Sequence, residues 1–141
     1  MPPVKLGKAM PKPFALISSR DIKAQEFFDV LRAAGGVIED AAAHAGRLSR
    51  GEEHVWVSLD NSLLEDYEAD EVELISQKLA DKPQSHILLD VSRTTGSERL
   101  AVDLAYACLE RWPCVFYNLR DKVFSAQDVV KLHKAGVGFE E

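Results

Sequence analysis

The sequence predicts a single α/β domain with a mixed or mostly parallel sheet of four to five strands and helices packed on it. Three observations predict this class. Short apolar runs alternate along the chain with segments of helical periodicity, and Gly, Pro and capping residues separate them. A length of 141 residues with 46% apolar and 28% charged side chains is typical of one globular domain. The apolar runs are far shorter than the roughly twenty residues that cross a bilayer, so we expect no contact with a membrane.

Residues 1–13 hold four prolines and three lysines. Because proline fixes φ and removes a backbone donor, this segment predicts an extended arm, followed by one domain over residues 14–141. Phe14–Ile17 is a short apolar run that predicts a buried strand. A helix is predicted from about residue 21 to 34, ending at a pair of glycines, with one apolar stripe formed by Ala24, Phe27, Phe28 and Leu31.

Residues 37–52 leave several structures open. Val37-Ile38 fits the start of a strand, residues 41–45 fit one helical turn, and residues 47–49 fit a strand that pairs across a turn at Arg50-Gly51. The next segment, residues 54–59 (HVWVSL), alternates β-branched and aromatic residues with polar ones. It therefore predicts a strand buried on at least one face.

The second half continues the alternation of strands and helices. A helix is predicted over 68–80, and the near-continuous apolar run 85–91 is typical of a central parallel strand covered on both faces. Thr95-x-x-Glu98 predicts a capping box for a helix that ends near residue 111, and residues 114–117 predict a buried strand. Ser125-x-x-Asp128 opens a last helix that ends near Gly136. This order predicts crossover units and hence strands that run in the same direction.

Sequence motifs for catalysis or cofactor binding are missing. The chain has no Gly-rich nucleotide or dinucleotide loop and no G-x-S-x-G elbow. Its four histidines occur singly, without the spacing of a zinc site. Cys108 and Cys114 are too few for a disulfide framework and are expected to be buried thiols in a reducing compartment. We therefore expect no enzyme, no cofactor, no metal and a cytoplasmic location.

Polar residues after two of the predicted strands suggest an alternative function. In a parallel sheet the residues past the carboxyl ends of the strands meet at one edge, where ligands usually bind. A loop that runs into a helix N-terminus there can hold an anion. This alternative, a small enzyme or ligand-binding regulator, would use Arg20, Asp90, Ser92 and Arg93. The same residues also suit helix capping and rim ion pairs, and both interpretations stay open.

The distribution of charge is the most informative feature. The formal net charge is −6, yet no Lys or Arg occurs between Gly51 and Gln77, a stretch that holds nine acidic residues. Six of the nine residues in 65–73 (EDYEADEVE) are acidic. Acidic residues in the first turn of a helix gain from its dipole, which accounts for part of this concentration but not for the loop before the helix.

Two interpretations of the acidic stretch follow. It is either a solvated face or a docking face for a basic partner, whose association such a field would accelerate. Nucleic acid is not expected to bind directly, because phosphates require a positive surface. The docking interpretation assigns partner binding to Asp60, Glu65, Asp66, Tyr67, Glu68, Asp70, Glu71 and Glu73, with Tyr67 or Trp56 as aromatic anchor.

Residues 54–139 also show a pattern of spacing. The strands HVWVSL and SHILLDVS precede the segment AYACLERWPCVFYNLRDKVFSAQDVVKL, in which a helix ending in Glu-Arg-Trp-Pro leads to an apolar strand, a polar turn and a capped helix. This layout resembles small immunity proteins of bacterial contact-dependent growth inhibition and related polymorphic toxin systems. The resemblance implies a non-catalytic inhibitor that binds one cognate toxin domain, often a nuclease. It assigns no binding residue and no oligomeric state.

Overall fold

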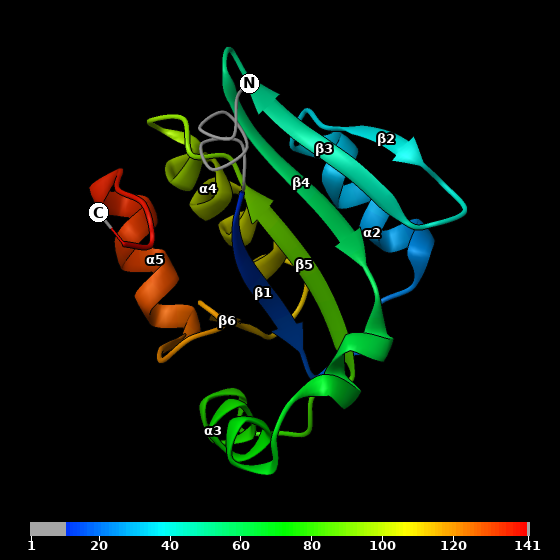
Figure 1. Cartoon of the computed structure of the whole chain (residues 1–141), viewed down its shortest axis with the longest axis vertical. Coiled ribbons are helices and arrows are strands. Elements are labelled where there is room, and N and C mark those ends of the chain that lie inside the picture. Colours follow the sequence, from blue (N-terminus) through cyan, green and yellow to red (C-terminus); the bar gives the residue numbers. More distant parts are fainter. Residues whose placement is uncertain (1–10, 141) are drawn as a thin grey trace, which may run out of the picture.

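The computed structural model describes residues 11–140. Seven strands form one sheet in the order β2-β3-β4-β5-β1-β6-β7, and every neighbouring pair is antiparallel (Figure 1). Within these residues, three α-helices and one 3-10 helix, η1, join strands, and a fourth α-helix follows the last strand. In chain order the elements are β1 (Lys12–Ser18), α2 (Ala24–Ala33), β2 (Val37–Asp40), β3 (Ala45–Arg50), β4 (Glu53–Leu59), η1 (Asn61–Asp66), α3 (Ala69–Leu79), β5 (Ser85–Val91), α4 (Ser97–Leu109), β6 (Cys114–Tyr117), β7 (Val123–Phe124) and α5 (Ala126–Ala135).

The predicted sheet of four to five mixed or mostly parallel strands is wrong. Crossover helices do join strands of the same direction, since β1–α2–β2 and β5–α4–β6 are such units. However, β5, β4 and β3 lie between β1 and β2, and β1 lies between β5 and β6. Neighbouring strands alternate in direction across the whole sheet, so no two parallel strands are neighbours. Periodicity along the chain predicts the elements but not which strands are inserted between them.

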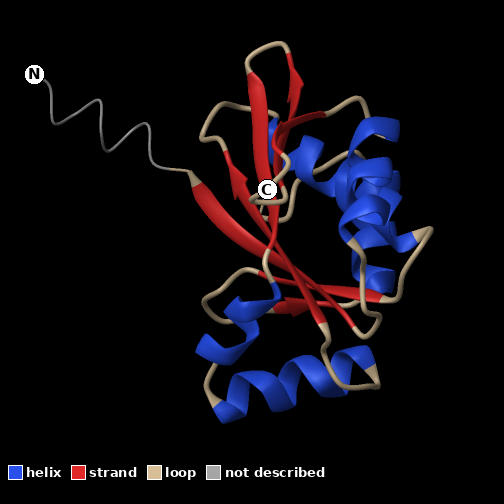
Figure 2. Cartoon of the chain, turned by 90° about the vertical axis from the view of Figure 1, so that its right-hand side faces the viewer, coloured by secondary structure: helices blue, strands red, loops and turns tan. Residues whose placement is uncertain are grey.

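The sheet separates two apolar layers. Phe14 and Leu16 of β1 face the larger core, which α2, α4 and α5 cover. Ala15 and Ile17 face the smaller core, which η1 and α3 cover on the other side. Figure 2 shows helices on both sides of the sheet, with η1 and α3 at its lower end. Alternate side chains of β1 are therefore buried in different layers, as the period of a strand requires.

The smaller layer covers only one end of the sheet. Along β4 the residues facing the larger core are buried, whereas Trp56 on the other face is 39% exposed. Val37 of β2, on the same face, is 51% exposed. Figure 2 shows this uncovered part of the sheet above η1 and α3, on the side opposite the helices of the larger layer. We call it the open sheet face.

Residues 37–52 form the β2–β3 hairpin and the turn into β4. The strand at Val37-Ile38 and the pairing across Arg50-Gly51 are confirmed, with Gly51 in the left-handed region at φ 63°. The helical turn over 41–45 is wrong, because residues 41–44 form a turn and β3 begins at Ala45. The first strand begins at Lys12, inside the predicted arm of 1–13, and residues 1–10 lie outside the described part of the chain.

The two predicted capping boxes have different outcomes. At α4 the box is wrong: Gly96 is the N-cap at φ 94°, and Glu98 forms an ion pair with Lys12 at 2.9 Å instead. At α5 it is confirmed. The backbone N–H of Asp128 donates to Ser125 Oγ at 3.2 Å, and the N–H of Ser125 donates to Asp128 Oδ2 at 2.9 Å.

Replacing Ser125 with alanine is expected to lower the free energy of unfolding by about 1 kcal/mol, because the N–H of Asp128 loses its acceptor. Urea denaturation followed by circular dichroism measures this change. Ser76→Ala is the control, since Ser76 lies inside α3, caps no helix and makes no side-chain hydrogen bond within the described chain. An equal loss in both variants would contradict a specific role for the cap.

Candidate functional site

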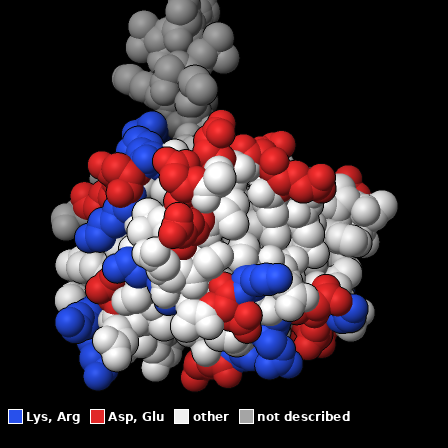
Figure 3. All heavy atoms as spheres, turned by 90° about the horizontal axis from the view of Figure 1, so that it is seen from below, with Lys and Arg blue, Asp and Glu red and all other residues white. Residues whose placement is uncertain are grey.

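The acidic residues predicted to bind a partner lie on η1, on α3 and at the ends of these helices. Asp60 is the N-cap of η1, and Glu68 is the N-cap of α3. Six of them are exposed, and we call them the acidic face: Asp60, Glu65, Asp66, Glu68, Asp70 and Glu73. Figure 3 shows this end of the molecule, where acidic side chains gather in the upper part and the Lys and Arg side chains lie mostly toward the left and the lower part.

Local hydrogen bonds hold the backbone that carries the acidic face. Asp60 Oδ1 accepts from the N–H of Ser62 at 3.1 Å and from its hydroxyl at 2.6 Å, which begins η1. Glu71 Oε1 accepts from the N–H of Glu68 at 2.9 Å, which begins α3. The carboxylates therefore satisfy free N–H groups and the positive ends of two short helices.

No Lys or Arg of residues 11–140 forms an ion pair with the acidic face. Of the nine acids in the basic-free stretch, only Glu53 has such a partner, since its carboxylate lies 3.2 Å from Arg50 Nε. Elsewhere in the described chain several acids are paired, as Glu98 is with Lys12. The negative charge of this face is thus not compensated by contacts within the described chain.

Two of the predicted partner-binding residues, Tyr67 and Glu71, are partly buried and make contacts with the sheet. The Tyr67 hydroxyl lies 2.7 Å from His86 Nε2, and its ring lies edge-on to Tyr117 with centroids 5.8 Å apart. The Tyr117 hydroxyl donates to Glu71 Oε2 at 2.5 Å. This bond and the one from the N–H of Glu68 hold the pKa of Glu71 below its usual value. Tyr67 and Glu71 attach η1 and α3 to the sheet.

His86 lies beneath this contact and is 2% exposed. Burial lowers its pKa to about 4, so its imidazole is neutral at neutral pH. Its Nδ1 is buried and has no hydrogen-bond partner within the described chain. The Nε2 atom of His86, unlike Nδ1, has a hydrogen-bond partner in the Tyr67 hydroxyl. The partner found, Tyr67, is 19 residues away, and only tertiary structure brings the two together.

Trp56 is the second predicted aromatic anchor, and it is more exposed than Tyr67. Its indole projects from β4 onto the open sheet face, next to Arg47 of β3 and Asp90 of β5. The other tryptophan, Trp112, is 4% exposed and belongs to the larger core. An exposed tryptophan on a sheet face is a common centre of protein contacts.

The residues of the alternative anion site do not come together. Because β1 and β5 are antiparallel, Ser18 pairs with Ser85, and Arg20 lies near the start of β5. Asp90 lies at the opposite end of β5. A pocket of about 220 Å³ does exist beside the loop that follows β5, lined by Lys12, Ser92, Arg93, Thr94, Thr95, Gly96 and Glu98. Arg20 and Asp90 are not among its lining residues.

Internal contacts occupy the polar groups of that pocket. Ser92 Oγ donates to Thr94 Oγ1 at 3.0 Å and accepts from the N–H of Thr94 at 3.2 Å. Lys12 lies 2.9 Å from Glu98 and 2.6 Å from Glu140. An anion would have to displace these two carboxylates, so the contacts do not favour anion binding.

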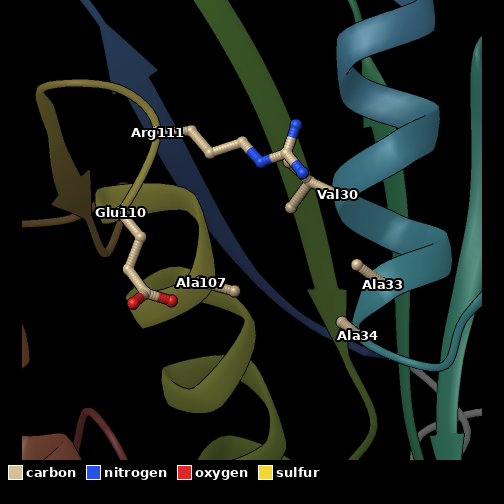
Figure 4. A pocket seen from close by; sticks show the side chains of 6 residues that line it. All are labelled: Val30, Ala33, Ala34, Ala107, Glu110 and Arg111. Carbon is tan, nitrogen blue, oxygen red and sulfur yellow. The ribbon is translucent and has the colours of Figure 1, made fainter.

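A second pocket of about 210 Å³ lies between the C-terminal ends of α2 and α4 (Figure 4). Its walls are small side chains, Ala33, Ala34 and Ala107, with Val30. Figure 4 shows Arg111 reaching across it toward α2, while Glu110 points away. The pocket belongs to the larger layer, on the side of the sheet opposite η1 and α3.

The other chemically reactive groups are buried or dispersed. Cys108 and Cys114 are free and buried, and burial raises the pKa of Cys114 to about 12 and that of Cys108 well above its usual value. Within residues 11–140 no group of three or more His, Cys, Asp or Glu side chains is placed to hold a metal ion. No helix of this part of the chain has the length and apolarity needed to cross a membrane.

Comparison of the chain with protein-family models, with curated proteins and with solved structures finds no match.

Proposed function

We propose that this chain is a non-catalytic, cytoplasmic inhibitor of the immunity type, which binds a basic, nuclease-like toxin domain through the acidic face. The observation that carries the proposal is the absence of ion pairs between the acidic face and the Lys and Arg residues of the described chain. A group of exposed, uncompensated carboxylates destabilises the isolated protein, and a basic partner would remove that cost.

Physical chemistry supports this type of partner over others. A negative surface attracts a basic protein over a distance of about 8–10 Å at physiological salt, raises the rate of association and repels nucleic acid. A nuclease cleft is positively charged because it binds phosphates, so a carboxylate surface can occupy the same cleft. The buried thiols suit a reducing compartment and give no accessible nucleophile.

Charge reversal on the acidic face tests the proposal. Asp66→Lys and Glu73→Lys together remove two exposed carboxylates whose side chains make no hydrogen bond or ion pair in the described chain. Each reversal adds two charges, so the net charge rises from −6 to −2. We expect the association rate with the toxin domain to fall by about tenfold or more at low salt, and its dependence on salt to weaken.

The matched control is Asp29→Lys with Glu110→Lys, which gives the same net charge from exposed positions in α2 and at the end of α4. The proposal requires such a toxin domain to be encoded beside this chain's gene, and that domain is the partner tested. The assays are growth of cells that express both proteins and stopped-flow association at several salt concentrations. Failure of the unaltered chain to protect these cells would refute the immunity function. Equal rates for the two double variants would refute the acidic face as the contact.

A further inference from the structure

The open sheet face carries a row of side chains that the acidic stretch did not include. Strand register places Val37, Arg47, Trp56, Asp90 and Pro13 side by side on neighbouring strands β2, β3, β4, β5 and β1. Directly opposite residues of antiparallel strands have Cβ atoms about 5 Å apart, so each member of the row lies beside the next. We call these five residues the Trp56 row.

The two charged members of the Trp56 row differ in their partners. Arg47 Nε lies 3.1 Å from Glu39 Oε2, so its charge is compensated within the β2–β3 hairpin. Asp90, on the other side of Trp56, forms no hydrogen bond or ion pair through its carboxylate within the described chain. It is partly buried, and this burial raises its pKa. A carboxylate removed from water without a partner is destabilising, and a bound cation would reverse this.

Neighbouring side chains restrict the indole of Trp56. The His54 ring lies beside it with centroids 5.6 Å apart, and Ser49 Oγ holds His54 Nδ1 at 2.8 Å. Trp56 nevertheless remains 39% exposed. An accessible indole next to an unpaired carboxylate suits a guanidinium, which stacks on the ring and pairs with the acid.

The Trp56 row lies on the same side of the sheet as the acidic face. Asp90 and His86 share one face of β5, and His86 contacts Tyr67 at the end of η1. Asp60 of the acidic face directly follows β4, and its backbone N–H donates to the carbonyl of His86 at 2.9 Å. A basic protein docked on η1 and α3 would therefore extend over the open sheet face.

We propose that the Trp56 row is the centre of the toxin contact, where an arginine of the toxin stacks on Trp56 and pairs with Asp90. This rests on the proposed function and deepens it. The acidic face then accelerates the encounter, while the Trp56 row slows dissociation, because a desolvated aromatic and a desolvated charge pair contribute most of the energy of an interface.

A peptide of alternating glycine and arginine, with both ends blocked, probes the Trp56 row without the toxin. Nitrogen–proton NMR of the full chain reports each indole N–H separately. The Trp56 signal is identified as the one that the Trp56→Phe variant lacks. We expect the peptide to shift the Trp56 signal and leave that of buried Trp112 unchanged. Asp90→Asn should weaken the peptide affinity by about fivefold. The matched control, Glu52→Gln, removes one exposed negative charge outside the row and should change the affinity by less than about twofold.

Three outcomes would overturn this inference. They are an unshifted Trp56 signal, equal affinities of the Asp90→Asn and Glu52→Gln variants, or a dimer of the chain in sedimentation that Trp56→Ala abolishes. The last result would assign the open sheet face to a second copy. If any of them occurs while reversal of Asp66 and Glu73 still slows association with the toxin domain, the proposed function stands and only the Trp56 row is refuted. If the unaltered chain gives no protection, the function fails whatever the peptide shows.

Discussion

Replacing Phe14 with alanine is expected to lower the free energy of unfolding by about 3–5 kcal/mol. Phe14 has no exposed surface and lies on β1, an interior strand of the sheet between β5 and β6. Its ring stacks on Phe139 at 4.9 Å, so the substitution removes an aromatic contact and leaves a cavity between β1 and the C-terminal residues. A domain of this size has only about 5–15 kcal/mol of stability, so the loss is a large fraction of the total.

Urea denaturation followed by tryptophan fluorescence measures this loss. Phe14→Leu keeps most of the side-chain volume and should lower the free energy of unfolding by less than Phe14→Ala does. The leucine variant therefore gives a measurable loss of stability even if the alanine variant is largely unfolded. Val37→Ala is the control on the opposite face of the same sheet, where the side chain is 51% exposed, and should change stability by about 0.5 kcal/mol or less. A similar loss for Phe14→Ala and Val37→Ala would contradict the two-layer assignment.

Stability is expected to fall by about 2 kcal/mol when the pH is lowered from about 6.5 to about 5, because of His86. In the folded chain its pKa is lowered to about 4 from an ordinary value of 6.5. Between these values the unfolded chain binds a proton that the folded chain does not. The stabilisation by neutral His86 is therefore complete above pH 6.5 and is lost as the pH falls toward 4. Desolvation is the main cause, and the nearby carboxylates of Asp60 and Asp66 oppose it.

Urea denaturation of the unaltered chain and of His86→Gln at about pH 7 and about pH 5 isolates this contribution. Glutamine does not titrate. Between about pH 7 and about pH 5 the free energy of unfolding of the His86→Gln variant should therefore fall by about 2 kcal/mol less than that of the unaltered chain. The pKa of Glu71 is lowered from its usual value of 4.5, so the stability that this carboxylate contributes is lost only at pH values below those compared here. Parallel pH profiles for the two chains would show that His86 is not neutral in the folded protein.

Local patterns predicted the positions of most elements in this chain. Residues 54–59, 85–91 and 114–117 are strands, and the Ser125 box begins the last helix, because alternation of side chains and capping act within a few residues. Which strands are neighbours in the sheet depends on contacts between residues that are far apart in the sequence. The pairs Phe14 with Leu89 and Leu16 with Phe116 depend on packing of all layers at once, which is why the parallel sheet was predicted wrongly.

The candidate surface also has one part that could be predicted from the sequence and another that could not. The acidic stretch was visible in the sequence because its residues are adjacent, and their exposure on η1 and α3 follows from that crowding. The attachment of Tyr67 to His86 and the juxtaposition of Trp56 with Asp90 join different strands and helices. Neither could be predicted from spacing, since each depends on the strand order.

The interior position of β1 has a consequence for synthesis of the chain. Its two neighbours, β5 and β6, begin at Ser85 and Cys114, so the first strand made is among the last to acquire both partners. The ribosome releases Phe14–Ile17 long before either neighbour exists, and these apolar residues need protection from aggregation meanwhile. Such distant pairing also slows refolding relative to helical domains of the same length. A nascent chain truncated before residue 114 lacks β6, one of the two neighbours of β1.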